Sequence, residues 1–318
     1  MNNETYRTHR CGHVTESLVG QEVRLAGWAA RIRDLGGVLF VGLRDRYGLV
    51  QVVCEDGQPL ELSKDFKLES VLGVRGTVRR RPDDMVNPEM ATGAIEVVAH
   101  EIEILNSCRP LPFQVDAAED ASEELRLKHR YIHLRHPVMA ENMRVRHRVA
   151  MAARNYLHGE DFLEVETPLL IKTTPEGARD YVVPSRIHHG QFYALPQSPQ
   201  LYKQILMASG VDRYFQLARC LRDEDLRSDR QPEHTQIDLE MSFVTENDIY
   251  QTVEEMMARI FAEGAGIDLP TPFPRISYDD AMNLYGSDKP DLRFGCPIHD
   301  VGALAKDSGF GVFEKALE

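Results

Sequence analysis

Residues 213–243 read RYFQLARCLRDEDLRSDRQPEHTQIDLEMSF, and polar and apolar residues alternate towards both ends of this stretch. Alternation over 214–222, broken only by Arg219, and again over 236–243 predicts two strands, each with one apolar and one polar face. If the strands pair as a hairpin, their polar faces form a single floor. The side chains on this floor are then Arg222, Gln236, Asp238 and Glu240.

The loop between these strands, 223–233, carries five acidic residues and two arginines. A hairpin needs only two loop residues, so a loop of this length indicates a function of its own. A solvated, charged tip is the simpler interpretation. However, an arginine at a strand end, followed by Asp-Glu-Asp, can hold a phosphate while the same loop receives an amine or a ribose.

The run CLRDEDLRSDRQPEHTQIDLEMSF, without a gap, resembles motif 2 of the class II aminoacyl-tRNA synthetases in its bacterial aspartyl form. The resemblance implies that Arg222 holds the α-phosphate of ATP and acts as the catalytic residue. It extends the ATP contacts to Asp223, Glu224 and Gln231.

Composition limits the classes of function. The 318 residues are enough for two domains, and the net charge of −13 excludes a general basic coat, so any RNA contact requires local basic patches. No apolar run is long enough to span a membrane, and the N-terminus lacks the apolar region of a signal peptide. Five dispersed cysteines without a CxxC pair indicate reduced thiols, with neither a zinc site nor a disulfide framework. We therefore expect a cytoplasmic protein.

Residues 1–107 predict a small all-β domain. Five strands separated by turn signals, with a short helix after the third strand, are typical of an OB-fold barrel, although another small barrel or half of a sandwich also fits. The expected strands are Glu22–Arg31, Val38–Asp45, Leu49–Cys54, Val71–Arg79 and Ala94–Leu105, with the helix at Leu60–Phe66. OB-folds bind single-stranded bases through aromatic stacking and through hydrogen bonds from arginine and amide groups.

The run GWAARIRDLGGVLFVGLRDRYGLVQVV, residues 27–53, resembles the anticodon-binding domain of the bacterial aspartyl-tRNA synthetases. The resemblance implies anticodon contacts from Arg33, Phe40 and Gln51. Ala30 and Ile32 stand where the family commonly has polar or basic residues, so we expect no contact from them. Leu35 stands where members that also charge asparagine tRNA often carry histidine. We therefore expect specificity for aspartate tRNA alone.

The rest of the chain is expected to form a connector and an incomplete catalytic domain. The connector, 108–136, is proline-stiffened and then acidic before a basic helical run, and it fits either a solvated linker or a hinge that touches tRNA. A long helix over 138–158 and a strand ending at Pro168 resemble motif 1, which implies a homodimer interface. The catalytic part is assigned to 137–288, and 289–318 to the start of a bacterial insertion domain.

Two further motifs suggest an amino-acid pocket. The loop TTPEGARD, 173–180, can close over a ligand, and Pro199 in QSPQLYK suits the start of a helix, which places Gln200 and Lys203 one turn apart. A surface turn and a solvated lysine are the simpler alternatives. The resemblance implies that Glu176 reaches the substrate α-ammonium and that Lys203 pairs with the substrate side-chain carboxylate. The full set of aspartate-binding residues that it implies is Glu176, Ser198, Gln200, Lys203, Arg222, Asp238 and Glu240.

The implied activity is that of an aspartate–tRNA ligase, which uses L-aspartate, ATP and aspartate tRNA. A general acid–base role for Asp238 and Glu240 is disfavoured, because this reaction needs no protein base. The arginine of motif 3 and the acids that bind Mg²⁺ in the family have no counterpart here. We therefore expect no metal ligands in this chain and a fragment that is inactive alone.

The fold class expected is α+β: an OB-fold barrel followed by the first part of a class II antiparallel-sheet domain. Two alternatives remain at the sequence level. One is a related asparaginyl- or lysyl-type synthetase, which shares the OB domain and motif 2. The other is a tRNA-binding paralogue without catalysis.

Overall fold

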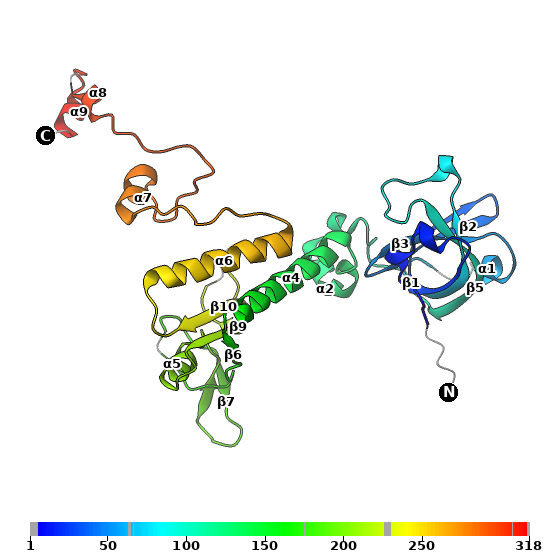
Figure 1. Cartoon of the computed structure of the whole chain (residues 1–318), viewed down its shortest axis with the longest axis horizontal. Helices are drawn as coiled ribbons and strands as arrows, with labels where there is room; N and C mark the ends of the chain where they lie inside the picture. Colours follow the sequence, from blue (N-terminus) through cyan, green and yellow to red (C-terminus); the bar gives the residue numbers. More distant parts are fainter. Residues whose placement is uncertain are drawn as a thin grey trace. The chain divides into compact units, whose positions relative to one another are not determined.

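The computed structural model describes residues 6–62, 65, 67–174, 176–225, 230–306 and 308–316. The chain divides into two compact units, Met1–Met143 and Arg144–Glu318, and helix α4 (Pro137–Gly159) contains the boundary between them. Figure 1 shows the barrel of the first unit and the helices and sheet of the second.

The first unit is a closed five-stranded barrel, as predicted. Its strands are β1 (Glu22–Leu35), β2 (Val38–Asp45), β3 (Gly48–Cys54), β4 (Val71–Arg80) and β5 (Ile95–Asn106). They close in the order β1-β2-β3-β5-β4, with β3 and β5 parallel and the other pairs antiparallel. Helix α1 (Gly57–Leu62) begins three residues before the expected start at Leu60, and the expected end at Phe66 lies outside the described residues.

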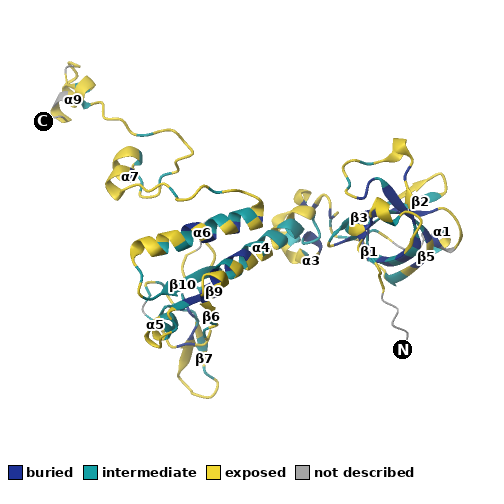
Figure 2. Ribbon diagram, viewed as in Figure 1, coloured by how far each residue is buried: buried dark blue, intermediate teal, exposed yellow. Residues whose placement is uncertain are grey.

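Strict alternation along the strands fills the barrel. The inward side chains form one buried apolar core that includes Leu25, Leu43, Val50 and Leu72, and Figure 2 shows buried and less buried positions along the same strands. Strand β1 is four residues longer than predicted, because residues up to Leu35 continue to pair with β2. Beyond Arg31 only Ile32 is still partly buried against the barrel core, and residues 33–35 are exposed, so the period-two pattern is too short to mark this part of the strand. Short 3₁₀ helices lie at Cys11–His13, Glu16–Leu18, Asp83–Met85 and Ala118–Asp120.

A buried ion-pair cluster attaches the connector to the barrel. The connector contains α2 (Glu123–Lys128) and α3 (Arg130–His133), and Arg135 follows them. The buried Glu69 carboxylate accepts two hydrogen bonds from Arg44 Nη2, both at 2.8 Å, and one from Arg135 Nη1 at 2.7 Å. The Arg135 guanidinium also lies 5.3 Å from the centre of the Trp28 ring. The end of the connector is thereby fixed to β1 and β2.

The second unit packs two helices against a three-stranded sheet. The sheet contains β6 (Leu163–Glu164), β9 (Arg213–Leu221) and β10 (Glu233–Met241) in the order β10-β9-β6, with β6 parallel to β9. Helix α4 and helix α6 (Glu246–Ala265) contribute Leu157 and Ile260 to a core that also includes Phe215. The other elements are β7 (Val182–Pro184), β8 (Phe192–Ala194), α5 (Gln200–Ala208), α7 (Tyr278–Tyr285), α8 (Gly302–Ala305) and α9 (Gly311–Ala316).

The predicted end of the second hairpin strand, at Phe243, was wrong. Strand β10 stops at Met241, and Phe243 has a positive φ of 56° and a fully exposed side chain. The chain turns here because Thr245 and Asp248 form a capping box at the start of α6. The other end also differs, since Glu233 pairs with Leu221 as part of the strand and not of the loop. The strand before Pro168 is only two residues long.

Among the helices that the structure describes, none is long and apolar enough to cross a bilayer.

The Glu69 cluster gives a prediction for barrel stability. In Glu69→Gln, two arginines face a neutral amide, and breaking a largely buried ion pair costs about 3 kcal/mol. Residue 69 has a positive φ of 65°. Glutamine has the same backbone preferences as glutamate, so the substitution does not change the strain of this conformation. Urea unfolding followed by the fluorescence of Trp28, the single tryptophan, measures the loss.

The matched control is Glu101→Gln, which removes a carboxylate that lies 3.2 Å from Arg75 Nε in an exposed pair on the same barrel. Exposed pairs contribute at most about 1 kcal/mol. Equal losses for the two variants would show that the Glu69 cluster does not hold the barrel together.

Candidate functional site

The register of the β9–β10 hairpin forms the polar floor predicted from the sequence. Asp238 lies opposite Gln216, and Glu240 lies opposite Tyr214. Because opposite residues share a face, these four side chains lie on one side of the sheet. On the other side, Phe215 and its neighbours join the apolar core. The sequence thus predicted both the pairing and the polar face correctly.

Lys203 reaches this floor from α5. Its Nζ lies 3.0 Å from Asp238 Oδ1 and 3.1 Å from Glu240 Oε2, and the side chains of Lys203 and Asp238 are each only 12% exposed. Helix α5 begins directly after Pro199, as the sequence predicted, which aims Lys203 at the sheet. The alternative of a solvated lysine is therefore wrong.

Two carboxylates share this one ammonium group, and the electrostatics follow from that. Burial alone lowers the pKa of Lys203, but the hydrogen bonds that its ammonium group donates to Asp238 and Glu240, together with their charges, outweigh burial and raise the pKa, so the lysine stays charged. Burial raises the pKa of Asp238, and the ammonium group opposes that rise. An ammonium group has three donors, and two of them are used here.

Two buried polar atoms near this floor have no partner in the described part of the chain. They are Asp238 Oδ2 and Arg222 Nε. Buried polar atoms in folded proteins nearly always form hydrogen bonds, so both atoms are candidates for ligand contacts. The backbone of Arg222 is fixed, because its N–H donates to Pro232 O at 2.8 Å across the base of the loop.

The loop that contains Glu176 is held over the start of α5. Ser198 Oγ donates to Glu176 Oε2 at 2.7 Å, and Gln200 N donates to Ser198 Oγ at 3.3 Å. The buried Gln197 anchors the loop from below, since its Nε2 donates to Ala178 O at 2.9 Å and its Oε1 accepts from Ala178 N at 3.1 Å. Glu176, Ser198 and Gln200 are thus brought together, as expected.

The Cys220 thiol shows that these groups lie close to one another. Burial, together with the charges of Asp238 and Glu176, raises its pKa to about 11, and the cations Arg222 and Lys203 lower it. The sulfur also lies 3.0 Å from Gln236 Oε1 across the hairpin. The thiol therefore responds to charges of both signs from Asp238, Glu176, Arg222 and Lys203.

Three predicted ATP-binding residues are less well defined. Asp223 N donates to Arg179 O at 3.1 Å, which joins the loop to the segment after Glu176. Glu224 and Gln231 flank residues 226–229, which lie outside the described residues, and no described contact joins either one to the floor. In the described ranges, no group of three histidine, cysteine, aspartate or glutamate side chains is arranged to hold a metal ion.

The second candidate surface is the outer face of the barrel. Arg33 on β1 lies opposite Phe40 on β2, and Gln51 on β3 lies opposite Gly42. Phe40 and Gly42 are two residues apart, so Arg33, Phe40 and Gln51 share one outward face. Gly42 has no side chain to cover this face. A Cβ at this position would lie only 3.2 Å from Arg31 Cβ, which is a tight contact.

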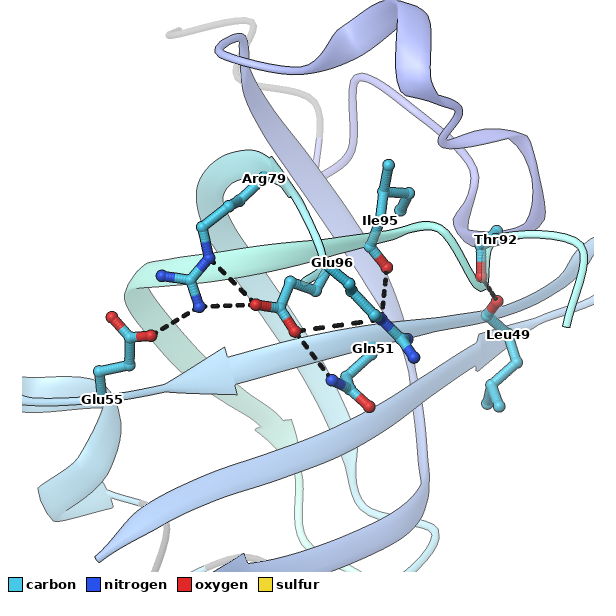
Figure 3. A network of polar contacts seen from close by, with 8 residues as sticks. Leu49, Gln51, Glu55, Arg79, Thr92, Ile95 and Glu96 are labelled. Atoms are coloured by element: carbon cyan, nitrogen blue, oxygen red, sulfur yellow. Dashed lines mark hydrogen bonds and ion pairs between the residues drawn. The ribbon is translucent and has the colours of Figure 1, made fainter. Parts of the chain in front are cut away.

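Gln51 is oriented by a charged network, shown in Figure 3. Its Nε2 donates to Glu96 Oε2 at 2.9 Å, and Arg79 donates to Glu96 Oε1 through Nε at 3.0 Å and Nη2 at 2.6 Å. Arg79 Nη2 also donates to Glu55 at 2.6 Å. Since Glu96 holds the amide nitrogen, Gln51 presents its amide oxygen as an acceptor.

The family models match both units. Residues 23–105 match the OB-fold nucleic acid binding domain, and residues 122–306, more than half of the chain, match the tRNA synthetases class II (D, K and N). The chain belongs to the class II tRNA synthetases. Its fold, a five-stranded barrel followed by a mixed α/β catalytic domain, is the one expected from the sequence.

Curated relatives narrow the comparison within the class II synthetases. The chain is 53% identical over 315 residues to an aspartate–tRNA ligase of Geobacillus kaustophilus, covering 98% of the chain and 53% of the relative. It is 52% identical to an aspartate–tRNA(Asp/Asn) ligase of Bacillus subtilis, again over 98% of the chain and 53% of the relative. The chain therefore spans about half the length of the curated relatives it matches.

A solved structure has the same fold. The crystal structure of asparaginyl-tRNA synthetase from Pyrococcus horikoshii, complexed with asparaginyl-adenylate, matches with a TM-score of 0.76 and 28% identity. The match covers 93% of this chain and 70% of that one.

Sequence reasoning missed two supporting residues of this synthetase chain. Gln197 gave no signal, because a buried glutamine in a polar run looks like any surface residue. Glu96 did give one, since a single acid inside the apolar run AIEVV indicates a buried partner.

Burial of the floor predicts slow thiol labelling. Iodoacetamide reacts with the thiolate, and a pKa near 11 instead of the ordinary 9.0 removes about 10²-fold of it at pH 8. Cys220 of the native protein should therefore label at least ~10²-fold more slowly than the exposed Cys296, and both should label equally in urea. Mass spectrometry of each peptide over time provides the measurement. Labelling of native Cys220 at the rate of Cys296 would show that the floor is open.

Proposed function

We propose that this chain is part of an aspartate–tRNA ligase. Such an enzyme activates L-aspartate with ATP to aspartyl-adenylate and then transfers the aspartyl group to the 3′ end of aspartate tRNA. The observation that carries the proposal is the largely buried Lys203 ammonium group, which Asp238 and Glu240 hold at the pocket floor. The names of the 52–53% identical relatives support the same activity.

The pocket suits an amino acid with an acidic side chain. In the described ranges no acceptor takes the third N–H of Lys203, which can therefore donate to the ligand's side-chain carboxylate, while Asp238 keeps the lysine oriented and charged. Glu176, held by Ser198, is placed for the α-ammonium group, with Gln200 beside it. Arg222, whose Nε lacks a partner among the described residues, is assigned to the α-carboxylate and the α-phosphate.

The chemistry needs positioning and charge neutralisation more than proton transfer. An oxygen of the aspartate α-carboxylate attacks the α-phosphorus of ATP, and pyrophosphate leaves. A hydroxyl of the terminal tRNA adenosine then attacks the acyl carbon, and AMP leaves. Arg222 neutralises charge that develops on the α-phosphate, and Asp223, Glu224 and Gln231 are assigned to the nucleotide. Mg²⁺ would neutralise the other phosphates, and we assign its main ligands to residues outside this chain.

The barrel face is assigned to the anticodon. Phe40 offers a ring for stacking, Arg33 a donor beside it, and Gln51 an acceptor that Glu96 holds in place. The relatives include proteins named aspartate–tRNA ligase and proteins named aspartate–tRNA(Asp/Asn) ligase. Leu35 supports the narrower choice, aspartate tRNA alone.

The assembly proposed is a cytoplasmic homodimer. Leu163, Leu169 and Leu170, which follow α4, all have exposed side chains. Three exposed leucines this close in sequence suit an interface between two copies of the chain.

Phe40 provides a test of the anticodon assignment. Loss of one stacked base should cost about 1–3 kcal/mol, so Phe40→Ala should bind an aspartate anticodon stem-loop at least ~5-fold more weakly, while Phe40→Tyr should bind normally. Fluorescence anisotropy with labelled RNA measures the affinity. Phe243→Ala, at a fully exposed phenylalanine of the other unit, is the matched control. Equal binding of cognate and scrambled anticodons would contradict the assignment.

Lys203 provides a test of the amino-acid assignment. Lys203→Met should reduce aspartate activation by ~10²-fold or more and change ATP affinity little, because a charged hydrogen bond and its buried partners are lost. The measurement is aspartate-dependent ATP–pyrophosphate exchange by this chain continued with the second half of the Geobacillus kaustophilus relative. The chain alone should not approach the usual enzyme range of ~1–10³ s⁻¹.

Lys306→Met, at an exposed lysine, is the control for loss of a positive charge. If Lys203→Met keeps the wild-type preference for aspartate over asparagine, the discriminating charge lies elsewhere.

A further inference from the structure

A basic and aromatic cluster lies at the turn between β2 and β3, away from the residues assigned to the anticodon. We call this cluster the Tyr47 patch, and it consists of Arg7, Arg10, His13, Arg46 and Tyr47. We propose that it binds the RNA phosphate backbone of the stem beneath the loop that the barrel face reads. The proposal rests on the tRNA-binding function proposed above and adds a second contact surface to it.

The patch is built into the fold before any ligand binds. Cys11 is fully buried in the barrel core, and its N–H donates to Asp45 Oδ2 at 2.9 Å. Tyr47 N donates to Asp45 Oδ1 at 2.8 Å, so one carboxylate fixes both the N-terminal segment and the turn. The two backbones touch, because a Cβ on Gly12 would lie 2.0 Å from Tyr47 O. A fixed platform of this kind loses little conformational entropy on binding.

Positive charge is stacked around the Tyr47 ring. The Arg10 guanidinium carbon lies 4.0 Å from the ring centre, that of Arg46 lies 5.1 Å away, and the His13 ring centre lies 4.9 Å away. Stacking on the Tyr47 ring orients the Arg10 guanidinium and leaves the N–H groups along its edge able to bind a phosphate. Among the described residues, no carboxylate lies within 4.0 Å of the Arg10 guanidinium. The one acid in the turn, Asp45, is buried, accepts hydrogen bonds from the backbone of Cys11 and Tyr47, and lies 3.9 Å from Arg7 Nη1.

The charge of the chain makes this cluster informative. A protein with a net charge of −13 repels a polyanion, so RNA contacts must come from local positive patches. The segment 7–13, RTHRCGH, has two arginines, two histidines and no acid. The segment 7–13 is therefore locally basic, whereas the chain as a whole is acidic.

The position of the patch indicates which part of an RNA it meets. Arg46 follows Phe40 by six residues along β2 and its turn, which corresponds to about 20 Å at ~3.3 Å per residue. For an RNA that runs along β2, several nucleotides therefore separate a base stacked on Phe40 from the nucleotides at the patch. That distance leads from the loop into the paired stem, where only the backbone is exposed to such a surface.

The test compares two labelled RNAs, the aspartate anticodon stem-loop and its loop sequence alone as a linear oligonucleotide. For the stem-loop, each phosphate that the protein neutralises contributes about 1 to the slope of log K against log salt concentration. Arg10→Gln should therefore make the slope shallower by about 1 for each phosphate that Arg10 binds, and Arg10→Lys should keep the wild-type slope. Binding of the linear loop should be the same for all three proteins.

The matched control is Arg80→Gln, which removes the same charge from an exposed arginine of the same barrel. A wild-type slope for Arg10→Gln, or an equal loss on the linear loop, overturns the inference. If Phe40→Ala weakens binding while Arg10→Gln does not, the Tyr47 patch alone is wrong. If the wild-type protein binds neither RNA, the proposed tRNA function fails together with it.

Discussion

The pairing register of β9 and β10 is the constraint on which the rest of the catalytic unit depends. Each strand has one apolar face against α4 and α6 and one polar face, which in β10 carries Asp238 and Glu240. A shift of one residue would bury Asp238 and Glu240 in the apolar core and expose Ile237 and Leu239. The cost of burying two unpaired carboxylates excludes that alternative. The core therefore fixes the register, and the register in turn places the functional groups.

The polar floor of the hairpin and the outer face of the barrel both hold polar side chains in fixed orientations. Lys203 is fixed by two carboxylates, and Gln51 is fixed by Glu96, which Arg79 holds in turn. In both places a buried charge orients the group that is assigned to the ligand. Because a buried polar group without its partner is costly, substitution of a supporting residue such as Glu96 also disturbs the group that it orients.

The sequence predicted most of the architecture because periodicity reports burial directly. The barrel strands and the hairpin follow from a pattern of two residues, and the helix that carries Lys203 follows from Pro199 at its start. The failures occur where side chains from distant segments decide. The exposed Phe243 fits the strand period, yet the capping box of α6 ends the strand before it. Glu69 and Gln197 resemble surface residues, and only their tertiary partners, Arg44 and Ala178, show otherwise.

The order of the sheet has a consequence for handling the protein. In the described part of the chain, β10 is nine residues long and pairs only with β9, so its other edge presents free backbone donors and acceptors. An open edge of that length is a template to which another extended segment can add by main-chain hydrogen bonds alone. This edge is therefore a surface through which copies of the chain can associate. A charged or proline substitution on the outer edge of β10 is the means to weaken that association.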